Sequence, residues 1–245
     1  MKYLKLVVLW FFCLFLPLIS EGKISKNNKE IIFETDGFGI VLDAKSGAWK
    51  KTLSDMQVVM STNRTKVPFD LALSKDGKML SQGGTKYKLS EVKELDKNTL
   101  ELTIEANQFI CKVIYQLFPD EKMIKTSCRL GNTTNLEATI YRFHLNLPRV
   151  KFNEKSSYSL PGMFPQIKER KLKDFIDGRV VQAWRDPCAV IIEINPDLTI
   201  FSAIDRTEFY GDISRTAITE MPSGIGLSHT VESSGYLKNG DPWQI

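Results

Sequence analysis

The sequence predicts an all-β fold built from antiparallel strands, and three consecutive segments before Asn132 carry the strongest signal. Apolar Leu100, Leu102 and Ile104 alternate with threonine and glutamate, which is the period of two that a strand with one buried face shows. The following segment has the same alternation, and Pro119-Asp120 then marks a turn. No stretch before Asn132 has a helical period over a dozen residues, so the whole region is predicted to be β. The three strands are predicted at residues 99–105, 109–117 and 123–130.

The rest of the chain consists of short strand patterns divided by turn residues. Asp36-Gly37 and the segment 43–47, Asp43-Ala44-Lys45-Ser46-Gly47, separate the first three strands into a meander. Between Pro148 and Gly178 the strand signal weakens, so this part is predicted to be a long excursion over the surface. Further strands are predicted at residues 30–35, 39–42, 49–53, 67–73, 87–92, 136–147, 179–184, 189–194, 198–204, 216–221 and 225–231.

The N-terminus predicts export from the cytoplasm. Lys2 and Lys5 precede an uncharged run over residues 6–20, which is typical of a secretory signal peptide over residues 1–22. The run is shorter than the roughly 20 residues of a membrane-spanning helix, so an anchor is the weaker interpretation. The mature protein is then expected to be secreted, periplasmic or extracellular. Residues 23–245 are predicted to form one β-sandwich domain, which we expect to be truncated at its C-terminal end because the chain stops on apolar residues.

Charge and cysteine content exclude some classes of function. Without residues 1–22 the net charge changes from +4 to about +3, so bulk charge predicts no nucleic-acid partner. The sequence contains no Cys/His cluster with metal-ligand spacing, and we expect neither a metal nor a cofactor. Cys111 and Cys128 are expected on one face of two neighbouring strands. A cross-strand disulfide and two buried thiols both fit these positions.

The turns and strand ends together resemble the galactose-mutarotase-like β-supersandwich. The residues that carry the resemblance are Asp36-Gly37, segment 43–47, Tyr115-Gln116-Leu117-Phe118-Pro119-Asp120 and Asn132-Thr133. The likeness is greatest to the N-terminal β-sandwich of large secreted bacterial glycoside hydrolases and polysaccharide lyases. In those enzymes the sandwich commonly precedes and packs against a catalytic helical barrel. The resemblance therefore implies a polysaccharide or oligosaccharide ligand and a C-terminal catalytic domain that this chain does not contain.

Two short segments combine the residue types that bind sugars. Sugar sites pair an aromatic ring, which covers the C–H face of the sugar, with charged or amide groups that bond its hydroxyls. Trp184, Arg185 and Asp186 offer both types at the end of a predicted strand. Tyr210 and Asp212 offer them again. These five residues are the predicted carbohydrate-binding site, and packing of the aromatic rings in the core is the alternative.

No residue is predicted to be catalytic. An aldose epimerase would need an acid and a base around the anomeric carbon, and His144 and His229 are the two histidines available. The predicted function is that of a non-catalytic N-terminal module of a secreted carbohydrate-active enzyme, which supports the catalytic domain and contacts the glycan. A stand-alone carbohydrate-binding or aldose-epimerase-like protein and a surface protein without a ligand are the alternatives.

Overall fold

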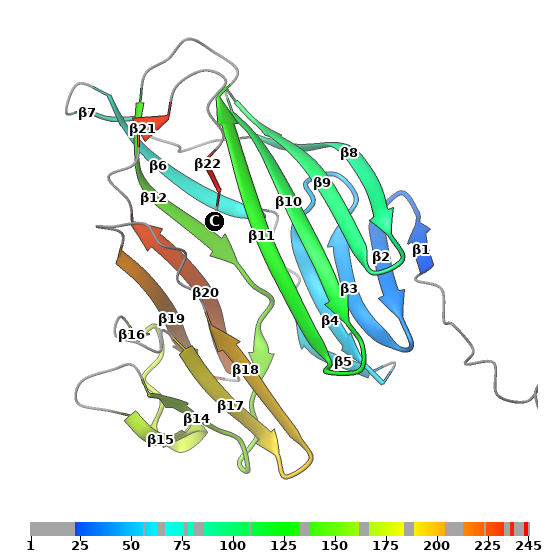
Figure 1. The fold of residues 1–245 in the computed structure, drawn as a ribbon. Coiled ribbons are helices and arrows are strands. Elements are labelled where there is room, and N and C mark those ends of the chain that lie inside the picture. Colours follow the sequence, from blue (N-terminus) through cyan, green and yellow to red (C-terminus); the bar gives the residue numbers. More distant parts are fainter. Residues whose placement is uncertain are drawn as a thin grey trace, which may run out of the picture.

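A computed structural model of the chain describes residues 23–245 except 56, 63–66, 76–77, 81–85, 108, 133–137, 162–166, 184–188, 204–212, 223, 233–235, 238–242 and 245. The described strands form four antiparallel sheets (Figure 1), which confirms the predicted all-β fold. A single short turn of 3-10 helix, η1 at Leu172–Asp174, is the only helical element of the described residues. Among these residues, no helix is long and apolar enough to cross a membrane. The predicted signal peptide lies outside the described part of the chain.

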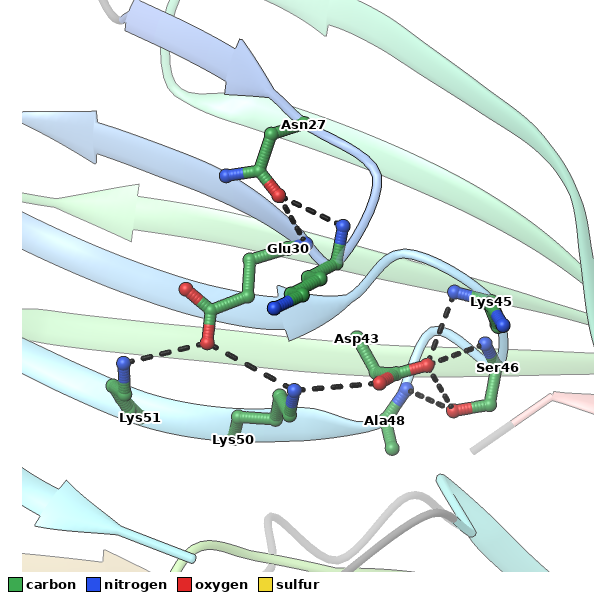
Figure 2. Close-up of polar contacts among 9 residues, drawn as sticks. Asn27, Glu30, Asp43, Lys45, Ser46, Ala48, Lys50 and Lys51 are labelled. Atoms are coloured by element: carbon green, nitrogen blue, oxygen red, sulfur yellow. Dashed lines mark hydrogen bonds and ion pairs between the residues drawn. The ribbon is translucent and has the colours of Figure 1, made fainter. Parts of the chain in front are cut away.

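The first sheet is a meander of five strands in chain order. Asp36 and Gly37 both have positive φ and join two strands in a two-residue hairpin, as the sequence predicts. In the next turn the Asp43 side chain accepts hydrogen bonds from the backbone N–H groups of Lys45 and Ser46 at 3.0 and 2.9 Å (Figure 2). The strands are β1 (Lys23–Lys26), β2 (Glu30–Thr35), β3 (Phe38–Asp43), β4 (Trp49–Ser54) and β5 (Gln57–Ser61).

The second sheet contains the three strands with the strongest sequence signal. It has the order β22-β11-β10-β9-β8 and stacks against the first sheet, as Figure 1 shows. The Trp49 ring meets Tyr115 edge to face across this interface, with ring centroids 5.5 Å apart. The strands are β8 (Tyr87–Asp96), β9 (Thr99–Ala106), β10 (Phe109–Phe118), β11 (Met123–Asn132) and β22 (Trp243–Gln244).

The central sheet joins strands that lie far apart in the sequence. Its order is β16-β19-β20-β12-β6-β7, with β13 and β21 paired to β20 and β12. Stacked Phe69 and Phe143 lie in its buried face, and Phe69 also contacts Tyr87 of the second sheet. The strands are β6 (Phe69–Lys75), β7 (Lys78–Leu80), β12 (Ala138–Asn146), β13 (Val150–Lys151), β16 (Val180–Ala183), β19 (Ile213–Met221), β20 (Gly224–Glu232) and β21 (Tyr236–Leu237).

The small sheet corrects one prediction. Residues 148–178 were expected to run over the surface, but they contribute β14 and β15, and β14 lies inside a sheet of order β15-β14-β17-β18. Tyr158 and Leu160 of β14 are 1% and 0% exposed, so this segment supplies part of the core. The strands are β14 (Ser157–Leu160), β15 (Ile167–Lys171), β17 (Ala189–Asn195) and β18 (Leu198–Ala203).

Candidate functional site

The predicted carbohydrate-binding residues lie outside the described residues. Trp184, Arg185 and Asp186 belong to segment 184–188, and Tyr210 and Asp212 belong to segment 204–212. The first segment connects β16 to β17, and the second connects β18 to β19. Each segment therefore connects the central sheet with the small sheet.

The strand ends that flank these two segments are paired in the small sheet but not in the central sheet. At one end Ala183 of β16 lies opposite Thr216 of β19 in the central sheet. At the other end Ala189 of β17 lies opposite Ala203 of β18 in the small sheet. The two segments thus meet the small sheet at paired positions on either side of the β17–β18 hairpin, whereas Ala183 pairs with a residue inside β19 and not with its first residue, Ile213.

The two histidines are on adjacent strands but on opposite faces of the central sheet. His144 of β12 lies opposite Thr230 of β20, whereas His229 lies opposite Leu145. Because residues opposite each other in an antiparallel pair share a face, and successive residues alternate, the two imidazoles point to different sides. The hydrogen bonds agree: the His144 Nδ1 lies 2.8 Å from the Thr230 Oγ1, and the His229 Nδ1 lies 3.0 Å from the Thr216 Oγ1. The pair of histidines that an epimerase would need does not share one site.

His229 joins the central sheet to the small sheet. Its Nε2 lies 2.8 Å from the hydroxyl of Ser202 in β18, so both ring nitrogens have hydroxyl partners. Burial, with a smaller contribution from nearby His144, lowers the pKa of His229 to about 4. A neutral imidazole held between two hydroxyls at a sheet interface is a structural contact.

The opposite face of the central sheet carries a cluster of polar side chains on three neighbouring strands, which we call the polar array: Asp70, Arg142, His144, Asn146 and Thr230. His144 lies opposite Asp70 on one side and Thr230 on the other. Arg142 and Asn146 flank His144 on its own strand and face the same way. Burial lowers the pKa of His144; the charge of Asp70 opposes this shift and that of Arg142 adds to it. The array can donate and accept hydrogen bonds side by side, which suits a polar ligand.

A second polar cluster, the Glu220 cluster, lies buried between the central and small sheets. Glu220 is 0% exposed and accepts hydrogen bonds from the Tyr158 hydroxyl at 2.6 Å and the Ile176 N–H at 2.8 Å. The Arg170 guanidinium forms an ion pair with it through Nε and Nη2. Burial alone would raise the pKa of Glu220, but bonds from Arg170, Ile176 and Tyr158 outweigh it and hold this pKa below its usual value. Among the described residues, no buried side-chain N or O atom of this cluster lacks a hydrogen-bond partner, so the cluster holds the sheets together.

The Glu220 cluster was not predicted from the sequence. Arg170 belongs to the basic run 168–173, which has the composition of a solvated loop, and Tyr158 lies in the segment expected at the surface. The only signal was a glutamate within the apolar alternation of residues 216–221. A charged residue on the buried side of a strand calls for a buried partner.

The two cysteines lie on neighbouring strands and on one face, as predicted. Cys111 lies opposite Leu130, and Cys128 lies opposite Val113, so the cysteines are diagonal neighbours. Both are buried free thiols, and the hydrogen bond with Cys128, together with burial, raises the pKa of Cys111. Diagonal Cα atoms in such a ladder are about 7–8 Å apart, at the limit that a disulfide can bridge. The disulfide stays a prediction for oxidising conditions.

Within the described residues, no group of three or more histidine, cysteine, aspartate or glutamate side chains could hold a metal ion.

No protein-family model matches the sequence, and no curated protein does either. Solved structures do resemble the fold. The Slr1438 protein from Synechocystis sp. PCC 6803 superposes with a TM-score of 0.58 at 11% identity, over 89% of this chain and 94% of that chain.

The GH36 α-galactosidase AgaB from Geobacillus stearothermophilus superposes with a TM-score of 0.53 at 10% identity. The superposition covers 91% of this chain but 40% of AgaB, so this chain spans less than half the length of that enzyme. At such identities the likeness shows the fold alone.

Proposed function

We propose that this chain is the non-catalytic N-terminal β-sandwich module of a secreted carbohydrate-active enzyme, with the galactose-mutarotase-like β-supersandwich fold. One observation carries the proposal: 91% of the chain superposes on 40% of AgaB, so the whole fold corresponds to one part of a larger glycoside hydrolase. Its partners would be an oligosaccharide and a catalytic domain encoded downstream. The N-terminal sequence supports secretion.

The predicted carbohydrate-binding residues specify where in the chain the glycan would be contacted. Trp184, Arg185 and Asp186, with Tyr210 and Asp212, would contact the glycan from two segments that join the small sheet at the paired residues Ala189 and Ala203. Titration of residues 23–245 with oligosaccharides, followed by tryptophan fluorescence, tests this. We expect a saturable change that the Trp184→Phe variant lacks. An identical change in both proteins would remove the support for this patch.

Sequencing the gene beyond the Ile245 codon tests whether this chain is a module of a larger enzyme. We expect the frame to encode a further domain, and hydrolysis of aryl glycosides by the full product but not by residues 23–245. A stop codon directly after Ile245, or hydrolysis by residues 23–245 alone, would contradict the proposal.

A stand-alone carbohydrate-binding protein is the second candidate. Slr1438 favours it, because that superposition covers 94% of the Slr1438 chain and so leaves little room for another domain. The epimerase form of this candidate loses support because His144 and His229 face opposite sides of the sheet. The same sequencing beyond the Ile245 codon distinguishes the two candidate functions.

A further inference from the structure

The polar array carries two exposed charged side chains, Asp70 and Arg142, on neighbouring strands. Some other carboxylates of the fold pair with lysines. The Glu30 carboxylate lies 3.8 and 3.4 Å from the ammonium groups of Lys50 and Lys51, and Figure 2 marks both ion pairs. Among the side chains that the structure describes, none forms a hydrogen bond or ion pair with the Asp70 carboxylate or the Arg142 guanidinium; the strand pairing places Glu232 opposite Arg142. Asp70 and Arg142 are both exposed on neighbouring strands of one face. Their hydrogen-bonding capacity is therefore available to a ligand.

The part of the array between these two charges is held in place. The His144 ring is half-buried and fixed by the 2.8 Å contact of its Nδ1 with the Thr230 hydroxyl, and Thr230 is 7% exposed. The Asn146 amide is held by a 3.3 Å hydrogen bond from its Nδ2 to the Val67 carbonyl. Ordered groups at the centre lose little conformational entropy when a ligand binds.

The charge of the array selects the kind of ligand. The strand pairing places Glu232 opposite Arg142 and Arg215 opposite Thr230, so this face has two acidic and two basic positions and no net charge. Burial lowers the pKa of His144, which favours its uncharged form. An anion would be repelled by Asp70, and a cation would be repelled by Arg142. A neutral ligand with neighbouring hydroxyl groups can donate to the carboxylate and accept from the guanidinium at once.

We propose that the polar array is a second carbohydrate site, which binds a neutral sugar through Asp70, Arg142 and His144. This inference rests on the proposed association with carbohydrate, but it concerns other residues than those of segments 184–188 and 204–212. It assigns binding and no chemical step. Asp70 would accept from one hydroxyl and Arg142 would donate to its neighbour, with the imidazole between them.

The two histidines allow a direct test by NMR. The sequence has 2 histidines, so the imidazole Cε1–H region of residues 23–245 contains two signals, and a His144→Gln variant assigns them. We expect methyl α-glucoside or methyl α-galactoside to shift the His144 signal saturably. The His229 signal should stay in place, because that ring lies on the other face and both of its nitrogens already contact hydroxyl groups. Glucuronate and glucosamine should bind at least tenfold more weakly. Equal shifts of both signals, no saturable shift, or tighter binding of a charged sugar would overturn the proposal.

Variants then show which groups bind. Asp70→Ala and Arg142→Ala should each weaken binding of the neutral sugar at least tenfold, whereas Glu105→Gln, at a solvent-facing side chain of β9 in the second sheet, should leave the binding unchanged. An unmoved His229 signal in each variant verifies that the fold is intact. Wild-type affinity in both alanine variants would refute the assignment. This outcome can be distinguished from failure of the module proposal. Sugar binding to the array would support this inference, whereas a stop codon directly after Ile245 would contradict the module proposal, and the two results are independent.

Discussion

Replacement of Glu220 by glutamine is the sharpest test of how the two sheets are held together. The carboxylate is fully buried and accepts hydrogen bonds from Tyr158, Arg170 and Ile176. Glutamine keeps the shape but removes the charge and turns an N–H₂ group toward donors. The guanidinium of Arg170 then loses its partner at a site from which water is largely excluded.

The size of the effect follows from these contacts. Breaking a buried ion pair by removing one partner costs about 3–5 kcal/mol. The Arg170 side chain is 18% exposed and can turn partly toward water, so we expect the lower end, about 3 kcal/mol. For a domain of this length each kcal/mol lowers the Tm by roughly 2–4 °C, which gives a decrease of roughly 6–12 °C. Tyr158→Phe removes one bond to the carboxylate and should cost about 2 kcal/mol.

Urea unfolding of residues 23–245 at pH 7, followed by tryptophan fluorescence, measures these differences. The control is Glu105→Gln, the same substitution in an exposed ion pair with Lys88, which should change stability by less than about 0.5 kcal/mol. If Glu220→Gln is no more destabilising than this control, the Glu220 cluster does not hold the sheets together.

The same variant has a defined pH dependence. The pKa of Glu220 is lower in the folded protein than the usual value of about 4.3. A carboxylate with a lowered pKa contributes stability that is present above its unfolded pKa and is lost as the pH falls through the folded pKa. The stability gap between wild type and Glu220→Gln should thus be complete at pH 7 and narrow below about pH 4. A gap that does not narrow would refute the electrostatic explanation.

Three further predictions concern single residues. Gly47 has φ +72°, and a Cβ there would lie 2.8 Å from the Ile104 Cδ1, so Gly47→Ala should cost at least about 2 kcal/mol in urea unfolding. Gly178→Ala, at φ +76° with open space around it, should cost about 1 kcal/mol and serves as the control. The Thr52 hydroxyl is buried without a hydrogen-bond partner among the described residues, so Thr52→Val should raise the unfolding free energy by about 1 kcal/mol; a decrease would contradict this. The pKa of His229 is about 4 in the folded protein, so stability should fall as the pH drops from about 6.5 toward 4. A His229→Gln variant with an equally steep decline in urea midpoints would contradict this assignment.

The strands that the sequence predicts well are those with long alternation. Residues 99–105 and 109–117 correspond to Thr99–Ala106 and Phe109–Phe118 in the structure, because each has four or five apolar residues on one face. The strand Ser157–Leu160 was missed, since four residues followed by Pro161 are too short to show a period. The alternation within one strand shows which of its faces is buried, but it does not show which other strand pairs with it.

For that reason, the candidate site could be predicted only in part. The sequence shows that His144 shares a face with Arg142 and Asn146, because this follows from alternation within one strand. It contains no information on the partners Asp70 and Thr230, which are brought there by pairing with two other strands. The ion pair between Glu220 and Arg170 could not be predicted for the same reason, because it joins residues of two different sheets.

The pairing in the central sheet also sets when this protein can finish folding during synthesis. The first sheet is a meander in chain order, and β8 to β11 of the second sheet follow one another too, so these strands can pair while later residues are still being made. The central sheet cannot close in this way, because Thr230 pairs with His144 across 86 positions of sequence. A nascent or shortened chain that ends before β20 would expose the edge of β12, an unpaired strand of the kind that promotes aggregation. The polar array is thus among the last features to assemble, and a bound sugar would report a chain folded to its final strands.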